Sequence, residues 1–147
     1  MSFTSWLISR VLRRAPDFHI GSPPYLERWW IIPRNPIFNI YLHRLLRDDD
    51  PRALHDHPWV NCSIILRGSY WEIMPNETRL RRPGEIVFRR ATASHRLALD
   101  RGAECWSLFI TGPVVRVWGF HCPKGWVPWQ QFVKPGEKGQ IGAGCGE

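Results

Sequence analysis

The stretch LHDHPWVNCSIILRG, residues 54–68, decides how the rest of the chain is interpreted. It opens with two histidines, His55 and His57, on either side of Asp56, and it closes on Gly68 after an apolar run. In an extended chain alternate side chains share a face, so the two imidazoles point one way and Asp56 points the other. Two imidazoles on one face are a ready pair of ligands for a transition metal. The stretch therefore predicts an extended segment that presents two ligands of a metal site on one face.

A second segment, further along the chain, contains a third histidine. Asn61 and Gly68 follow His57 with three and then six residues between, and a Pro-Gly turn at residues 83–84 precedes His95 by eleven residues. This order resembles the two motifs of the cupin superfamily. The first of those motifs joins an HxH pair to a glycine, and the second joins a Pro-Gly turn to a third histidine.

The resemblance covers about residues 54–97 and implies both a fold and a cofactor. The fold is the all-β cupin, a double-stranded β-helix or jelly-roll barrel, here preceded by an α-helix. The cofactor is one divalent metal ion held by His55, His57 and His95, with Fe(II) favoured and Ni, Mn or Zn as alternatives. No residues are assigned to an organic cofactor. Asn61 stands where the cupin pattern usually has Glu, so we expect it beside the metal as a hydrogen-bonding or weak fourth contact.

The three-histidine set carries no charge of its own. It leaves the positive charge of the metal intact, which strengthens the metal as a Lewis acid and favours anionic ligands. The open positions on the metal are then available to water or to a substrate. The predicted ligand is a small, anionic molecule.

The rest of the chain supports a β-rich domain. Apolar residues make up 44% of the 147 residues, and there are nine Trp and thirteen Pro, which favour strands, pocket walls and loops. Eight short runs bounded by turn residues are predicted as strands: Trp29–Ile32, Phe38–Leu46, Val60–Leu66, Tyr70–Ile73, Ile86–Phe88, His95–Leu99, Cys105–Ile110 and Val114–Phe120.

One helix is predicted, over Phe3–Arg14, with Ser2 or Thr4 as its cap. Its apolar stripe indicates a helix packed against the domain, with a membrane-surface helix as the alternative. We divide the chain into residues 1–20, the amphipathic helix and a loop; residues 21–133, the cupin barrel; and residues 134–147, a flexible Gly-rich tail.

Net charge restricts the partners that we expect, and hydropathy and cysteine content restrict the cellular compartment. The formal charge is +7, but the arginines are scattered, so nucleic acid is an unlikely partner. No apolar run is long enough to span a membrane, and there is no signal peptide. The four cysteines form no CxxC pair, and we expect them to be reduced in a soluble, cytoplasmic protein. A homodimer is compatible with the cupin resemblance.

Within the metal cupins, the histidine set resembles that of the thiol dioxygenases, such as cysteine dioxygenase, which bind thiol and O2 on Fe(II). Cys62 is similar to the cysteine that some of them cross-link to a tyrosine; the alternative is a small buried apolar residue. Two further residues are candidates for the site. His43 either contacts the substrate inside the barrel or is a strand histidine, and Arg116 either binds a carboxylate or faces solvent.

The function predicted is a non-haem metal-dependent oxygenase-like enzyme that acts on a small anionic molecule; if the protein is an enzyme, we expect a metal-dependent dioxygenase. One alternative is a cupin that binds its ligand without catalysis, which a tryptophan-plugged barrel favours. The other is a sugar isomerase or epimerase, which needs a free base near the metal, with His43 and Glu72 as the candidates.

Overall fold

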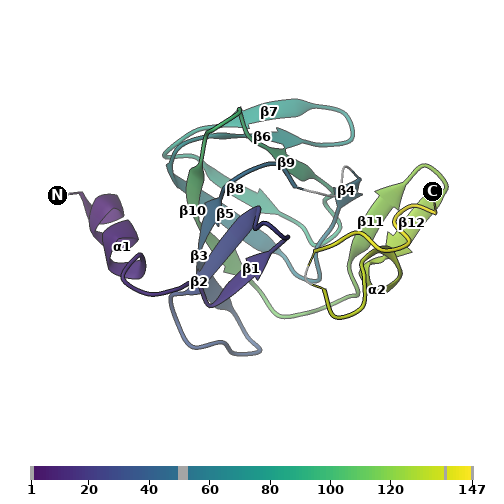
Figure 1. Cartoon of the computed structure of the whole chain (residues 1–147), viewed down its shortest axis with the longest axis horizontal. Helices are drawn as coiled ribbons and strands as arrows, with labels where there is room; N and C mark the ends of the chain where they lie inside the picture. The colour runs from purple at the N-terminus through teal and green to yellow at the C-terminus, as the bar shows by residue number, and fades with distance from the viewer. Residues whose placement is uncertain (1, 50–52, 138, 147) are drawn as a thin grey trace.

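The computed structural model describes residues 2–49, 53–137 and 139–146. Within these residues the chain forms the twelve strands and two short helices that Figure 1 labels. Their bounds, in chain order, are α1 Phe3–Val11, β1 Phe18–Ile20, β2 Leu26–Trp30, β3 Asn39–Leu45, β4 Leu54–His55, β5 Asn61–Arg67, β6 Tyr70–Ile73, β7 Thr78–Arg81, β8 Ile86–Arg89, β9 Arg96–Ala98, β10 Cys105–Thr111, β11 Gly119–Cys122, β12 Gly125–Pro128 and α2 Trp129–Phe132.

The strands form three antiparallel sheets. The largest has the order β1-β2-β3-β10-β5-β8, and the two smaller ones have the orders β12-β11-β4 and β7-β6-β9. A single antiparallel bridge between His55 and His95 joins the two smaller sheets. Figure 1 shows β6, β7 and β9 stacked on one side of the large sheet, with β11, β12 and α2 beside them. The result is a barrel of two walls, as the sequence predicts.

The interior of the barrel is unusually polar. On β5, Asn61, Ser63 and Ile65 are buried, whereas the residues between them remain partly exposed. On the neighbouring β8, Arg89 is buried in the same way. Because side chains alternate along a strand, this pattern points the polar residues inward. A polar interior indicates a binding site, because buried polar groups need partners.

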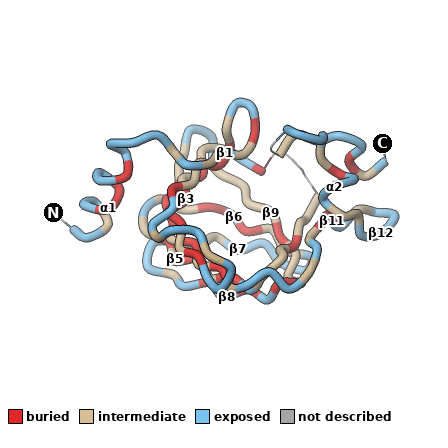
Figure 2. The backbone as a smooth tube through the Cα atoms, turned by 90° about the horizontal axis from the view of Figure 1, so that it is seen from below, coloured by how far each residue is buried: buried red, intermediate tan, exposed pale blue. Residues whose placement is uncertain are grey.

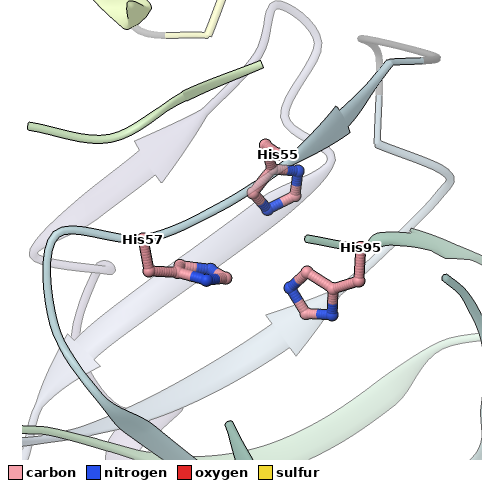
Figure 3. A group of neighbouring side chains, drawn as sticks. All are labelled: His55, His57 and His95. Carbon is pink, nitrogen blue, oxygen red and sulfur yellow. The ribbon is translucent and has the colours of Figure 1, made fainter. Parts of the chain in front are cut away.

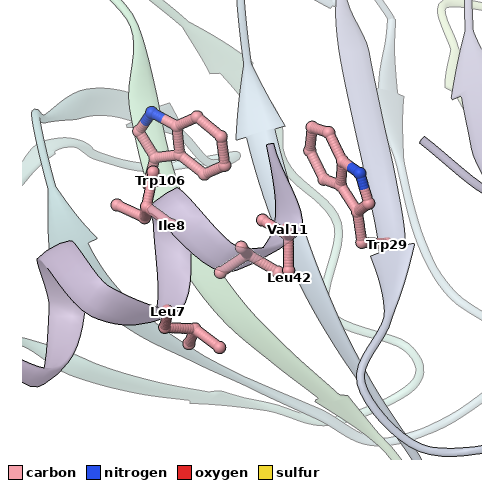
Figure 4. Packing of buried hydrophobic residues seen from close by; sticks show 6 residues of the cluster. All are labelled: Leu7, Ile8, Val11, Trp29, Leu42 and Trp106. Carbon is pink, nitrogen blue, oxygen red and sulfur yellow. The ribbon is translucent and has the colours of Figure 1, made fainter. Parts of the chain in front are cut away.

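Helix α1 packs on the outside of the large sheet. The Ser2 side chain accepts a hydrogen bond from the Ser5 N–H, which caps the helix. Leu7, Ile8 and Val11 are buried against a sheet surface made of Trp29, Leu42 and Trp106 (Figure 4). The packed helix is therefore confirmed. Neither helix in the described residues is long and apolar enough to cross a membrane.

The predicted strand Val114–Phe120 is mostly wrong. Only its end, from Gly119 onward, is in β11. Before that the Val115 N–H donates to the carbonyl of Pro58, 2.8 Å away, so this segment runs as a loop along the metal-site segment. The other predicted strands have counterparts in the structure, but β1, β4, β7 and β12 were not predicted. They are two to four residues long, too short for a periodic pattern to stand out.

The end of the chain folds back onto α2. The N–H groups of Gly142 and Gly144 both donate to the carbonyl of Phe132. A disulfide joins Cys122 on β11 to Cys145, and Figure 2 shows this part of the chain lying against α2 and β11. The expectation that all four cysteines are reduced is wrong for this pair, while Cys62 and Cys105 are free thiols.

The docking of α1 can be tested by truncating its buried stripe. Ile8, which is 3% exposed, lies in the cluster with the two tryptophans. Ile8→Ala should lower the free energy of unfolding by about 2–4 kcal/mol, as measured by urea denaturation. Leu12 follows the helix and is 51% exposed, so Leu12→Ala should change it by less than about 0.5 kcal/mol. Equal effects of the two changes would mean that α1 is not docked.

Candidate metal centre

Three imidazoles meet inside the barrel. His55 ends β4, His57 lies two residues further on, and His95 immediately precedes β9. One nitrogen of each ring lies within 4.8 Å of the corresponding nitrogen of the other two, and Figure 3 shows the three rings converging on one point. Two backbone hydrogen bonds, of 2.9 and 3.0 Å, join His55 to His95 and hold their strands in register. The structure therefore brings together the histidines that the sequence singled out.

Asp56 faces away from the histidines, as its position in the HxH segment predicts. Its carboxylate accepts hydrogen bonds from the Gly119 N–H at 2.8 Å and the Trp126 indole at 2.9 Å. It also lies 2.8 Å from Arg116 and 3.1 Å from His121. Burial would raise the pKa of Asp56, but these hydrogen bonds, led by that of Arg116, hold it below its usual value. Asp56 thus fixes β11 and β12 against the segment that carries the metal ligands.

Arg116 is therefore engaged in an ion pair. Besides Asp56, its guanidinium donates to the carbonyl of His57 and lies over the Trp126 ring. Through these contacts, the Arg116 guanidinium helps to hold the backbone of His57 in position. Its candidacy as a substrate-binding group stays a prediction.

Glu72 lies directly behind His95. Its Oε1 is 2.6 Å from His95 Nδ1, and its Oε2 accepts a hydrogen bond from Arg81 Nε at 2.7 Å. Arg89 Nε donates to Oε1 as well. Burial would raise the pKa of Glu72, but the hydrogen bonds of His95 and Arg89 lower it well below its usual value. An ionised Glu72 holds the proton on Nδ1 and turns Nε2 of His95 toward the other two histidines.

A second carboxylate stands behind His55. The Nδ1 of His55 lies 3.9 Å from Asp49, whose carboxylate also accepts a hydrogen bond from the Leu97 N–H. At this distance the carboxylate acts on the imidazole through its charge and not through a direct hydrogen bond. Sequence reasoning did not place Asp49 beside His55, and it offered Glu72 as a free base. Glu72 is 23 residues from His95 in the chain, so their contact depends on the pairing of β6 with β9.

The histidines are held in their neutral, metal-binding form. Burial, together with the neighbouring His95, lowers the pKa of His55 to about 3. Burial lowers the pKa of His57 and His95 too. Nδ1 of His57 is enclosed and has no protein partner among the described residues. Neutral imidazoles are suited to a metal ion, because the metal binds the ring nitrogen that carries no proton.

Asn61 occupies the interior next to this cluster. Its side-chain oxygen accepts a hydrogen bond from Arg89 at 3.3 Å. The amide nitrogen of Asn61 and the hydroxyl of Thr111, its partner across the sheet, are buried without a hydrogen-bond partner among the described residues. These two groups leave hydrogen-bonding capacity for something bound inside the barrel. The predicted contact between Asn61 and the metal stays a prediction.

His43 is not part of the cluster. It lies on β3, where its Nε2 accepts a hydrogen bond from Arg28 Nε at 2.8 Å. Burial and the charge of Arg28 hold the pKa of His43 well below its usual value, so the ring is neutral. Phe109 connects this region to the metal site, with ring centroids 4.7 Å from His43 and 6.3 Å from His57.

Arg28 is a functional candidate that sequence reasoning missed. Burial lowers the pKa of its guanidinium to about 10, and no carboxylate of the described residues forms an ion pair with it. It lies instead over the Tyr41 ring, 4.5 Å from the centroid. Its charge reaches the metal site, where it is one of the causes that lower the pKa of His57. A partly buried guanidinium without a counter-charge among the described residues favours an anionic ligand.

Aromatic side chains pack around His57. Trp59 is stacked on His57 with ring centroids 5.2 Å apart, and it meets Phe109 edge-on. Trp59 and Tyr41 also line a surface pocket of about 370 Å³, together with Arg34 and Asn39. The pocket thus has aromatic and basic lining residues, and Trp59 is common to the pocket and the surroundings of His57.

Cys62 lies outside this site. On β5 it alternates with the inward-facing Asn61 and Ser63, and it therefore lies on the outer face of the sheet. A cross-link from Cys62 to a tyrosine of the metal site does not fit this placement. The hydroxyl of the buried Tyr70 accepts a hydrogen bond from Arg89.

Comparison with known proteins finds its matches in structure alone. No family model and no curated protein matches the sequence. Among solved structures, a putative mannose-6-phosphate isomerase from Ralstonia eutropha JMP134 has a TM-score of 0.55 at 20% identity, over 67% of this chain and 93% of that one. The polyketide cyclase RemF from Streptomyces resistomycificus has a TM-score of 0.57 at 17% identity, over 71% and 80%. A cupin-2 domain protein from Shewanella frigidimarina NCIMB 400 has 0.52 at 13%, over 76% and 93%.

The chain adopts the cupin fold. The likeness confirms the fold predicted from the histidine motifs, and it places the histidine cluster inside a cupin barrel. At these identities it shows the fold and not the reaction, because one fold supports many chemistries.

The metal ligands can be tested by removing them singly. His57→Ala and His95→Ala should each abolish tight binding of a divalent metal, because each removes one of three ligands. The exposed His19 lies on β1, at the edge of the large sheet, so His19→Ala should leave metal content unchanged. Elemental analysis of untagged protein measures the metal, and near-ultraviolet circular dichroism confirms the fold. Metal content equal to that of the parent in both ligand variants would contradict the site.

The depressed pKa of His55 predicts a pH-dependent stability of the metal-free cupin. Because this pKa is about 3 in the folded protein, against an ordinary 6.5, the unfolded chain takes up a proton over this range and the folded chain does not. The stability that the group contributes is complete above pH 6.5 and is lost as the pH falls toward 3. His55→Asn should therefore flatten the dependence of the unfolding free energy on pH, and His19→Asn should not. Identical slopes in His55→Asn and the parent would refute the prediction.

Proposed function

We propose that this cupin is a non-haem metal-dependent oxygenase-like enzyme that acts on a small anionic molecule. The observation that carries the proposal is the pairing of a neutral three-histidine cluster with the guanidinium of Arg28, which has no counter-charge among the residues that the structure describes. The first would hold a metal, and the second would hold the acidic group of a substrate. The histidine cluster and Arg28 face the same barrel interior. Phe109 lies between them, in contact with His57 of the cluster and with His43, which accepts a hydrogen bond from Arg28.

The three histidines would hold the metal through neutral nitrogens. A redox-active ion such as Fe(II), held there, would supply open coordination positions for substrate and O2. The protein's own part is to keep the imidazoles neutral by burial, to orient His95 through Glu72, and to leave the charge of the metal uncompensated. An anionic substrate is attracted by both the metal and Arg28.

The anchoring role of Arg28 follows from how it is held. Its Nε donates to His43, and its plane lies over Tyr41, so the guanidinium is fixed in position before a ligand binds. The remaining N–H groups are suited to a carboxylate, which accepts two parallel hydrogen bonds. His43 thus serves as a positioning residue that fixes Arg28, and its neutral state avoids a second positive charge beside it.

Isomerase or epimerase chemistry is supported less well. It needs a base that is free to take a proton from the substrate. Of the two candidates, Glu72 is paired with His95, Arg81 and Arg89, and Nε2 of His43 accepts a hydrogen bond from Arg28. Both carry bonds that proton transfer would have to break.

A cupin that binds its ligand without turning it over remains the second candidate. Trp59 favours it, because this ring lines the surface pocket and is stacked directly on His57. A fixed Trp59 would block the metal from a substrate, whereas a ring that turns aside would admit one. Binding and turnover therefore have to be measured separately.

The proposal is tested by loading the protein with Fe(II) under anaerobic conditions and measuring O2 consumption with a panel of small thiol and hydroxy acids. An acid that is turned over should lose affinity in Arg28→Met, with KM raised about 10- to 100-fold, the loss expected for a charge-assisted hydrogen bond. Arg13→Met, which removes an exposed arginine that follows α1, should leave KM unchanged.

The outcomes separate the two candidates. Acid-dependent O2 consumption that is sensitive to Arg28 supports the oxygenase. Binding of an acid that depends on Arg28, seen by calorimetry without O2 consumption, supports the non-catalytic cupin. If no acid in the panel binds or reacts, or if Arg28→Met binds as tightly as the parent, the anionic-ligand proposal is wrong.

A further inference from the structure

The inner face of the large sheet carries a row of four polar side chains. Thr111 on β10 is paired with Asn39 on β3 and with Asn61 on β5. Asn61 is paired in turn with Arg89 on β8. All four residues are buried, and residues directly opposite each other in a sheet share a face. The row therefore runs across four strands, from Asn39 in the surface pocket to Arg89 beside Glu72.

The two ends of this row have partners within the chain. Arg89 donates hydrogen bonds to Glu72 and Ser63. At the other end, the amide nitrogen of Asn39 donates to the carbonyl of Asn35, and its amide oxygen accepts a hydrogen bond from the Asn35 N–H. The hydrogen-bonding capacity that is left over thus lies in the middle of the row.

The two middle residues each keep an unpaired group. The amide nitrogen of Asn61 and the hydroxyl of Thr111 have no hydrogen-bond partner among the described residues, although Asn61 is 2% and Thr111 1% exposed. A donor that is buried without an acceptor costs about as much free energy as a lost hydrogen bond. Two such donors at paired positions indicate that the acceptor comes from a molecule bound in the barrel.

Arg89 fixes which end of the Asn61 amide is unpaired. A guanidinium has only donors, so the amide atom that faces Arg89 at 3.3 Å has to be the oxygen. The N–H groups of Asn61 therefore point away from Arg89. An amide binds a metal ion through its oxygen, and this oxygen is already engaged. Asn61 thus presents a hydrogen-bond donor.

The two unpaired groups are close enough to share one acceptor. Directly opposite residues of an antiparallel pair have Cβ atoms about 4.5–5.5 Å apart. The Asn61 amide supplies an N–H, and the Thr111 hydroxyl rotates to supply an O–H. Neither group is charged, and the charge of Arg89 beside them is paired with Glu72. Two neutral donors are suited to a carbonyl oxygen, which accepts hydrogen bonds and donates none.

We propose that Asn61 and Thr111 form a subsite that binds a carbonyl oxygen, so that the ligand of this barrel is a small acid that also carries a carbonyl group. The inference rests on the proposed function in one respect, because Arg28 holds the acidic group of the same molecule. The subsite adjoins the surface pocket of about 370 Å³, which is lined by Asn39, the partner of Thr111, and by Gly112, the next residue in the chain.

The two anchoring groups lie within reach of one small molecule. The Arg28 guanidinium lies over the Tyr41 ring, and Tyr41 is two positions from Asn39 on β3. Arg28 and the carbonyl subsite are therefore one inward-facing row apart, which is about 7 Å along the strands. A chain of about five carbons with a carboxylate at one end has a length of this order.

Isothermal calorimetry with pentanoate and 4-oxopentanoate tests the subsite. The two acids have the same charge and chain length and differ in one carbonyl oxygen. The full chain should bind 4-oxopentanoate at least about 5-fold more tightly than pentanoate, because two hydrogen bonds are gained. The measurement is made with and without Zn(II), a redox-inert ion. The preference should appear in both, since the two donors belong to the protein.

Thr111→Val removes the hydroxyl with little change of shape and should reduce the preference for 4-oxopentanoate about 3- to 10-fold. Thr111→Ser keeps the hydroxyl and should retain the preference. Ser63→Ala is the matched control, because Ser63 is an inward-facing hydroxyl of the same sheet that already accepts a hydrogen bond from Arg89 at 2.9 Å. It should leave the preference unchanged, and near-ultraviolet circular dichroism confirms the fold of each variant.

Infrared spectroscopy gives a second measurement that does not depend on affinity. Hydrogen bonds to a carbonyl oxygen lower its stretching frequency. The ¹³C-labelled carbonyl of 4-oxopentanoate, bound to the metal-free chain, should absorb at a lower frequency in the parent than in Thr111→Val. Equal frequencies would mean that the Thr111 hydroxyl does not contact the carbonyl, which contradicts the subsite.

The remaining outcomes separate this inference from the proposed function. Equal affinity for the two acids would overturn the subsite, because a carbonyl would then gain nothing over the water that fills it. A preference that survives Thr111→Val, or one that requires Zn(II), would also overturn it. A preference that Thr111→Val removes and Arg28→Met does not alter, with binding as tight as in the parent, would keep the subsite and contradict Arg28 as the anchor. If neither acid binds, both proposals are wrong.

Discussion

The buried carboxylate of Glu72 is the interaction on which the barrel interior depends. It is 1% exposed and contacts two arginines and one metal-site histidine, so three elements of the barrel meet on a single side chain. The cost of burying one carboxylate and two guanidiniums is offset because each is paired and hydrogen-bonded, and loss of any one would leave an uncompensated charge in the interior. Arg89 then extends the network to Asn61, Ser63 and Tyr70. The orientation of His95 is thus set by the same ions that fill the interior.

Asp56 plays the corresponding part on the outside of the metal-site segment. Because it alternates with the two histidines, one short extended segment sends two imidazoles inward and one carboxylate toward β11 and β12. The carboxylate holds the C-terminal hairpin, and the hairpin places Phe120 and Trp118 near His55. The metal site and the attachment of the β11–β12 hairpin therefore both depend on the alternation of His55, Asp56 and His57 along one segment. A shift of this segment by one residue would disrupt both.

The features that could be predicted from the sequence are those that depend on local spacing. The parity of His55 and His57, the glycine turns and the apolar stripe of α1 are properties of neighbouring residues, and the structure bears them out. The features that were missed depend on pairings between distant strands. Glu72 meets a histidine 23 residues away, and Arg28 meets one 15 residues away. The disulfide likewise joins cysteines 23 residues apart. A sequence pattern does not encode such partners, because strand register in the folded barrel decides them.

The inner face of the large sheet holds polar and charged groups that are suited to a metal and an anion. The metal site is the central claim that these groups support. X-ray absorption spectroscopy at the edge of the bound metal tests it most directly. The account predicts a first coordination sphere with three imidazole nitrogens at about 2.0–2.2 Å, completed by oxygen from water or substrate. A sulfur ligand, fewer than three imidazoles, or a protein that takes up no metal after anaerobic loading would contradict it.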